Sequence, residues 1–214
     1  IAESNAGYAA IDSNGDGVTI RIAPGGIVRG EGSAIQCRGI DALVINEGKI
    51  LGTAGYGGVY LSSYAIDAEF INKGKIYGEQ YTVELRGDRS QVVNDKGALI
   101  SGSYAVVFMA GDEGVDLRFI NHGKVVTDGV TIRGYDSNDT IINDGKIIGS
   151  ISLADGEDKV DTRGGKIAGT ISGGSGDDTL ITDKAGYTLT ESAGQGFDTV
   201  KSTVTYALTE NVEK

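Results

Sequence analysis

Short apolar stretches recur along this chain, and the same polar sequence interrupts each of them. An aliphatic or aromatic pair is followed by Asn, a variable residue, Gly, Lys and another aliphatic residue in segments 44–50, 70–76, 119–125 and 141–147. Segment 92–99 repeats this box with one additional residue. The marker glycines are 26, 48, 74, 97, 123, 145 and 165, with separations of 22, 26, 23, 26, 22 and 20 residues. A unit this short cannot enclose a core alone, which indicates a solenoid.

The segments between the boxes favour strands over helices. Short β-branched runs, such as residues 129–133, alternate with Gly, Asn and Asp clusters, and no helical period is sustained. Three short strands with three turns take about 20 to 25 residues, and coils of a parallel β-helix stack about 4.8 Å apart. The sequence therefore predicts an all-β fold, a parallel β-helix (β-solenoid) of about seven to eight coils.

Stacking the repeats places equivalent residues above one another, so each column has a predicted role. Residues expected to point inward before the asparagine are Val44, Phe70, Val92, Phe119, Ile141, Val160 and Leu180. Those expected inward after the glycine are Ile50, Ile76, Leu99, Val125, Ile147 and Ile167. The asparagines 46, 72, 94, 121 and 143 are predicted to adopt a left-handed bend and to form a stacked amide ladder. The lysines 49, 75, 124, 146 and 166 are interpreted as a solvated outer column rather than a polyanion-binding stripe.

Composition supports the solenoid and restricts the partners. The chain of 214 residues has 35 glycines for tight corners and one proline, and 39% apolar residues argue against disorder. A net charge of −11 disfavours nucleic acid and anionic membranes and favours cations. The single cysteine, Cys37, is expected to pack as a small apolar residue. Because no signal peptide, transmembrane run or initial Met is present, we expect the chain to be part of a longer protein.

The most specific chemical signal lies towards the C-terminus. Residues 173–181 match the nonapeptide G-G-x-G-x-D-x-U-x, in which U is a large apolar residue, and residues 193–201 depart from it only at Ala193. Residues 153–160 keep part of the pattern and residues 136–141 keep less. The aspartates 139, 158, 178 and 198 are 19, 20 and 20 residues apart, about one coil each. Stacked carboxylates about 5 Å apart repel one another unless a cation lies between them, and hard oxygen ligands suit Ca²⁺.

The nonapeptides resemble the RTX, or haemolysin-type, calcium-binding repeats of bacterial secreted proteins, and residues 196–213 resemble the segment that often follows such repeats. The resemblance implies calcium between successive coils, first between those of Asp158 and Asp178 and next between those of Asp178 and Asp198. Because only one side carries the motif, it implies a single column of sites. The ligand residues expected are Asp155, Gly156, Asp158, Gly174, Gly176, Asp178, Gly194, Gly196 and Asp198, with Asp139 as a weaker candidate.

The resemblance also divides the chain into two parts. Residues 1–150 are similar to the Asn-x-Gly coils of autotransporter-type β-helix passengers, whereas 151–214 are RTX-like coils continuous with the same solenoid. A further calcium candidate comprises Asp12, Asn14 and Asp16, which match the first half of an EF-hand-type loop. Ala23 stands where the closing Glu belongs, so a plain Asp-Gly turn is the favoured interpretation.

Two other kinds of function remain open. Tyrosines that gather in the long coils, with Glu84, Arg86 and Arg89 nearby, are candidates for stacking on sugar rings; they are Tyr56, Tyr60, Tyr64, Tyr81 and Tyr104. Extracellular polysaccharide is thus a candidate partner, and a lyase or epimerase is an alternative to a non-enzymatic role. The only histidine, His122, occupies a variable slot of the box and is expected to be an exposed corner residue.

The open ends of a β-helix invite stacking by another chain, so a self-assembling filament is a third alternative. The favoured prediction is a non-enzymatic, calcium-stabilised structural or adhesive module of a larger bacterial protein, secreted or displayed at the cell surface. Calcium is its expected cofactor, with no nucleic acid partner and no membrane insertion.

Overall fold

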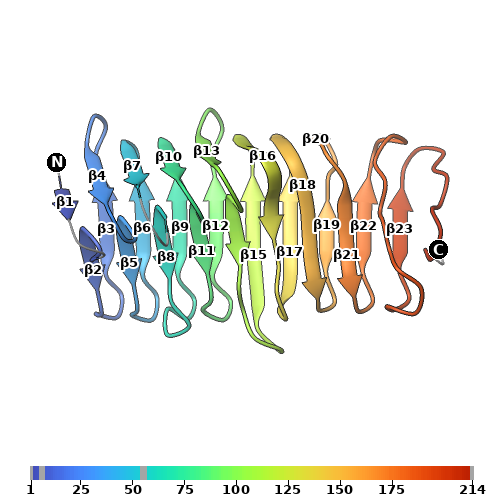
Figure 1. Cartoon of the computed structure of the whole chain (residues 1–214), viewed down its shortest axis with the longest axis horizontal. Helices are drawn as coiled ribbons and strands as arrows, with labels where there is room; N and C mark the ends of the chain where they lie inside the picture. The colour runs from blue at the N-terminus through green and yellow to red at the C-terminus, as the bar shows by residue number, and fades with distance from the viewer. Residues whose placement is uncertain (1, 5–7, 54–56, 213–214) are drawn as a thin grey trace.

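The computed structural model describes residues 2–4, 8–53 and 57–212. Its strands are parallel and stack in chain order along one axis (Figure 1). The strands complete about eight coils, so the predicted parallel β-helix is confirmed. The described residues contain no helix, and hence none long and apolar enough to cross a membrane.

One lateral face is a nine-stranded parallel sheet formed by the strand that precedes each box. Its strands, in spatial order, are β3 (Thr19–Ile22), β6 (Leu43–Asn46), β9 (Glu69–Asn72), β12 (Gln91–Asn94), β15 (Asp116–Asn121), β17 (Asn138–Asn143), β19 (Lys159–Asp161), β22 (Thr179–Thr182) and β23 (Thr199–Ser202). The nonapeptide motifs lie in the turns that lead into the last two strands of this sheet, β22 and β23.

The rest of each coil belongs to a 14-stranded sheet made of two neighbouring columns. The column after the box contains β1 (Ala2–Ser4), β4 (Ile27–Gly30), β7 (Lys49–Gly52), β10 (Lys75–Gly78), β13 (Leu99–Gly102) and β20 (Lys166–Ala168). The next column contains β2 (Ile11–Ser13), β5 (Ile35–Cys37), β8 (Val59–Leu61), β11 (Val83–Leu85), β14 (Val107–Met109) and β21 (Ile171–Ser175). The long strands β16 (Lys124–Arg133) and β18 (Lys146–Asp155) run through both columns and join them.

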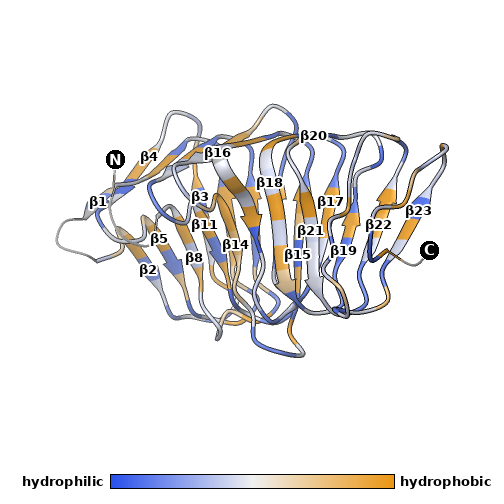
Figure 2. Ribbon diagram, turned by 45° about the vertical axis from the view of Figure 1, so that its right-hand side comes forward, coloured by the Kyte–Doolittle hydropathy of each residue, from blue (hydrophilic) through white to orange (hydrophobic). Residues whose placement is uncertain are grey.

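The core consists of the inward columns, and hydrophobic and hydrophilic bands alternate along the strands (Figure 2). Every predicted inward residue before the asparagine is buried, as are Cys37 and five of the six predicted after the glycine. The exception is Leu99, which is only half-buried, because Lys75 pairs with Leu99 and Ile76 with Ile100. Asn94 pairs with Asn72 and Leu99 with Lys75, so this turn has two additional residues, one more than the box comparison indicated, and Ile100 fills the core position.

The five asparagines form the predicted ladder inside the solenoid. The Nδ2 group of each one donates to Oδ1 of the next, at 2.8 Å for Asn46 to Asn72, 2.9 Å for Asn72 to Asn94 and 2.7 Å for each of the remaining two steps. The predicted left-handed bend is wrong, because none of the five has a positive φ; each instead ends a strand with its side chain buried. Thr162 occupies the next position, and the buried Nδ2 of Asn143 is left without a partner among the described residues.

Five of the marker glycines are required by close approach between coils, namely 48, 74, 123, 145 and 165, whereas a Cβ on Gly97 would meet no atom within 4 Å. A Cβ on Gly74 would lie 2.2 Å from the carbonyl oxygen of Gly48, and one on Gly145 would lie 2.3 Å from that of Gly123. Any side chain there would force neighbouring coils apart, which would break the hydrogen bonds that stack them.

The two ends of the solenoid differ. At the N-terminal end, β2 and β3 each pair on one side only within the described residues, with β5 and β6. At the C-terminal end, segment 203–212 lies over the last coil, where Thr209 donates to the Leu189 carbonyl and Asn211 to that of Glu191. Self-association through these ends stays a prediction.

Candidate functional site

The four aspartates of the motif stack inside the solenoid. The strand registers pair Thr140 with Lys159, Lys159 with Thr179 and Thr179 with Thr199, so the residue before each of these is brought into line with the next. Asp139, Asp158, Asp178 and Asp198 are all between 0% and 3% exposed. In the preceding coil the equivalent position is Leu117, a core residue. The aspartates therefore occupy an inward column that is apolar one coil earlier.

Backbone hydrogen bonds fix the orientation of each carboxylate. The N–H of each aspartate donates to Oδ1 of the aspartate in the next coil, at 2.7 Å for Asp139 to Asp158, 2.8 Å for Asp158 to Asp178 and 3.0 Å for Asp178 to Asp198. The hydroxyl of Ser137 donates to Oδ1 of Asp139 at 2.8 Å. One oxygen of Asp158, Asp178 and Asp198 thus links two coils, whereas Oδ1 of Asp139 is bonded within its own coil.

The second oxygen has no such use in three of the four residues. Oδ2 of Asp139, Asp158 and Asp178 is buried and has no hydrogen-bond partner among the described residues. Burial raises the pKa of Asp139 to about 8, and burial together with the charges of nearby carboxylates raises that of Asp158 to about 9. Burial likewise raises the pKa of Asp178 to about 7. Near neutral pH the column is therefore stable only if protons or a cation compensate its charge.

A fifth carboxylate, Glu191, joins this group, and the nonapeptide pattern does not include it. Ile171 pairs with Leu189, so Glu191 stands one coil beyond Gly173. It is 8% exposed and accepts from the N–H groups of Gly173 at 2.9 Å and Gly174 at 3.1 Å. Its negative charge contributes to the raised pKa values of Asp178 and Asp158. The sequence signal that could have located Glu191 is the alignment of Leu-Thr-Glu at 189–191 with Ile-Ser-Gly at 171–173.

The motif glycines bring carbonyl oxygens of successive turns close together. Gly174 and Gly176 have φ values of 116° and 121°. A Cβ on them would lie 1.8 Å and 1.9 Å from the carbonyl oxygens of Ala154 and Gly156. The other motif glycines, Gly156, Gly194 and Gly196, also have positive φ values. Glycine alone fits these turns, and Gly156 and Gly176 also line the open groove beside the aspartate column.

Not every predicted ligand faces this column. Asp155 is exposed and lines an open acidic groove with Glu113, Asp136, Asn138 and Glu157. Within the described part of the chain, no three carboxylate, imidazole or thiolate groups converge closely enough to hold a metal ion. A cation between two coils would thus take one or two aspartate oxygens and complete its shell with turn carbonyls. Such an all-oxygen donor set fits Ca²⁺.

The N-terminal calcium candidate has a different arrangement. Arg38 of the next coil donates to Oδ1 of Asp12 at 2.6 Å and to Oδ1 of Asn14 at 2.9 Å, while Asp16 accepts from the N–H of Ile40 at 2.9 Å. The guanidinium already supplies positive charge at this turn, and this arrangement agrees with the interpretation of a plain Asp-Gly turn.

Part of the predicted tyrosine group gathers on the outer face of β8, β11 and β14. Tyr60, Glu84 and Phe108 follow one another in the outward column, with Tyr81 stacked on Phe108 and Tyr104 edge-on to Tyr81. Tyr64 is 72% exposed and makes no ring contact within the described residues, and Tyr56 lies outside them.

Glu84 is buried within this aromatic group. It is 1% exposed, accepts from Arg86 at 2.7 Å and leaves Oε2 without a hydrogen-bond partner among the described residues. Burial raises the pKa of Glu84, while the hydrogen bond from Arg86 acts in the opposite direction. His122, by contrast, is exposed as predicted, with Nδ1 2.7 Å from Oδ1 of Asp144.

Comparison of the chain with protein-family models, with curated proteins and with solved structures gives no match.

Proposed function

We propose that this chain is a calcium-stabilised β-solenoid module with a structural or adhesive role outside the cell. The observation that carries the proposal is the column of buried aspartates, three of which keep a carboxylate oxygen with no hydrogen-bond partner in the described part of the chain. An apolar side chain occupies the same inward position at Leu117, so the fold does not require carboxylates there.

Calcium accounts for both halves of this arrangement. A divalent cation between two coils neutralises the carboxylates that burial otherwise destabilises, and the close-packed turn carbonyls provide the remaining oxygen ligands. The site involves successive coils, so it exists only when the coils are stacked. Binding energy at such a site is folding energy, and the stability of the C-terminal coils follows the calcium concentration.

The extracellular location follows from this coupling and from the RTX resemblance of residues 173–181 and 193–201. Where calcium is scarce, stacked carboxylates at positions 158, 178 and 198 keep these coils loose, and where it is abundant the coils stack. A module that folds on reaching calcium suits a protein that leaves the cell before it functions.

The test is a thermal melt of the whole chain at pH 7.5 in calcium, in magnesium and in excess chelator, followed by circular dichroism. We expect Tm to rise in calcium by several degrees, since about 100-fold excess over Kd adds about 2.7 kcal/mol. Magnesium should do less, because it requires a smaller octahedral shell and loses water reluctantly. Identical melts in all three conditions would refute the proposal and leave protonated aspartates as the explanation of the column.

A further inference from the structure

A second concave site lies on the opposite sheet, on the outer face of β14, β16 and β18, independent of the aspartate column. Three consecutive outward residues, Phe108, Arg133 and Ser152, are in register across these strands. Tyr81 stacks on Phe108 with ring centroids 4.5 Å apart, and Tyr104 meets Tyr81 edge-on at 6.0 Å. The Tyr104 side chain is 54% exposed, so this aromatic group presents ring surface to solvent.

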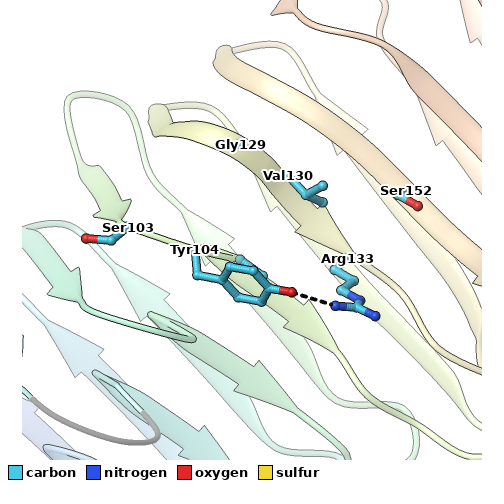
Figure 3. A pocket seen from close by; sticks show the side chains of 7 residues that line it. Ser103, Tyr104, Gly129, Val130, Arg133 and Ser152 are labelled. Atoms are coloured by element: carbon cyan, nitrogen blue, oxygen red, sulfur yellow. Dashed lines mark hydrogen bonds between the residues drawn. The ribbon is translucent and has the colours of Figure 1, made fainter.

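Arg133 is held against this group without a counter-charge. Its guanidinium lies 6.0 Å from the ring centroid of Phe108, and its Nη1 group donates to the Tyr104 hydroxyl at 3.1 Å (Figure 3). It forms no ion pair with any carboxylate that the structure describes, whereas Arg86 in the same group is bonded to Glu84. Two fixed contacts thus orient a guanidinium whose remaining N–H groups are suited to a ligand anion.

A pocket of about 240 Å³ separates Tyr104 from β16, with Ser103, Ala105, Val130 and Ser152 also in its lining. Figure 3 shows the Tyr104 hydroxyl pointing towards Arg133, and Val130 lies on the same strand as Arg133, β16. The pocket arises where β16 bulges, since its register against β18 shifts between Val126 and Val130 and again before Ile132. Pockets for drug-sized ligands exceed roughly 300 Å³, so this one suits a single ring.

We propose that this pocket binds one acidic sugar residue, a uronate, within a polysaccharide chain. The C–H face of a pyranose ring packs on Tyr104, and the carboxylate takes the guanidinium of Arg133. An apolar wall with a few placed polar groups is the usual construction of such a site.

The overall negative charge of the chain does not prevent this recognition. At physiological salt, charges farther away than about 8 Å are largely screened, so the local guanidinium dominates the interaction with a bound carboxylate. The acidic background selects against polyanions that do not place a carboxylate at Arg133. Weak binding by a single site is expected, with strength gained from repeated contact along a polymer.

The test is saturation-transfer NMR and calorimetry with trigalacturonate, against the neutral galactose trimer as a matched ligand, at constant calcium. We expect the ring protons of trigalacturonate to show contact, with Kd in the range of about 0.1 to 1 mM. Arg133→Gln keeps a donor for Tyr104 but removes the charge, so it should weaken trigalacturonate at least tenfold and leave the neutral trimer unchanged. Tyr104→Ala should weaken both ligands.

Tyr64→Ala removes a more exposed tyrosine outside the pocket and should change the binding of neither ligand. Melting curves of each variant establish that the solenoid is intact. The proposal is overturned if trigalacturonate shows no contact at about 10 mM, if Tyr104→Ala binds as the parent chain does, or if Arg133→Gln weakens both trimers equally.

Discussion

Replacement of Asp178 by Asn should stabilise the chain without calcium, and calcium should remove most or all of that advantage. Asn keeps an Oδ1 acceptor for the N–H of Asp158, which now donates to Asp178 at 2.8 Å. It removes the negative charge, whose burial raises the pKa from 3.8 to about 7. Each pH unit of that difference corresponds to about 1.4 kcal/mol, so the ionised carboxylate destabilises the folded chain by about 4 kcal/mol above pH 8.

The new amide group has its own cost, because its NH2 takes the place of a buried oxygen that has no partner among the described residues. An unsatisfied buried donor costs about 1 to 3 kcal/mol. In chelator at pH 8, Asp178→Asn should therefore be more stable than the parent chain by about 1 to 3 kcal/mol. With calcium at about 100 times Kd the parent chain gains about 2.7 kcal/mol, and the variant should gain little.

The assay is differential scanning calorimetry of both chains at pH 8, in chelator and in calcium. For a chain of this size, 1 kcal/mol moves Tm by about 2 to 4 °C, so the loss of this advantage in calcium is measurable. Asp177→Asn is the matched control, because Asp177 is exposed in the same turn and its Oδ1 accepts only from the Phe197 N–H. If Asp178→Asn lowers Tm equally in both conditions, the carboxylate is a structural acceptor and no cation is involved.

Three further predictions follow from other contacts. In chelator, Tm of the parent chain should fall as pH rises from about 5 to 9, because Asp139, Asp158 and Asp178 with their raised pKa values keep protons in the native state that the unfolded state has released. Calcium should flatten this dependence of Tm on pH. A Tm that does not change with pH in chelator would contradict the burial argument. Asn94→Ala should lower the free energy of unfolding, measured with denaturant, by about 2 to 5 kcal/mol, since it leaves the buried amides of Asn72 and Asn121 each without a hydrogen-bond partner in the ladder. Asn143→Thr at the end of the ladder should lower it by less than about 1 kcal/mol. Equal losses would show that the ladder does not act as a unit. Arg86→Gln should destabilise the chain by about 2 to 4 kcal/mol at pH 8, and by less as the pH falls and Glu84, whose pKa burial raises, takes up a proton. Glu84→Gln in the same chain should restore most of the loss, and failure of that double variant to recover would show that Arg86 acts through packing instead.

The periodic pattern was sufficient to predict the fold because every coil repeats the same inward positions. A residue such as Val44 or Phe70 has one role in all coils, and the spacing of the glycines sets the length of each coil. The same logic failed at Leu99, where the turn has two additional residues instead of the expected one, so that Ile100 lies in the core. Which residues of a turn are the extra ones depends on their backbone conformation, and the pattern alone did not reveal it.

The candidate site could be predicted only in part. Spacing correctly placed Asp139, Asp158, Asp178 and Asp198 in one column, since one coil separates each pair. It could not reveal that Oδ1 of Asp158, Asp178 and Asp198 accepts from the N–H of the aspartate one coil earlier. Nor could it reveal Glu191, which lies in a turn two residues longer than the equivalent turn one coil earlier. Those features depend on side-chain direction and turn geometry, which a motif does not encode.

The aromatic group shows a similar limit. The sequence gathered the tyrosines of the long coils, but Phe108, Arg133 and Ser152 entered the site only through strand register. They are 25 and 19 residues apart in the chain and adjacent in the sheet. The bulge of β16 that opens the pocket has no counterpart in the repeat pattern.

The central claim is that the buried carboxylates of the C-terminal coils bind calcium, and isothermal titration of the calcium-free chain with CaCl2 tests it most directly. The account predicts saturable heat at one or two sites per chain, abolished or strongly reduced in Asp178→Asn and retained in Asp177→Asn. Absence of heat up to about 5 mM calcium, together with an unchanged circular dichroism spectrum, would contradict it.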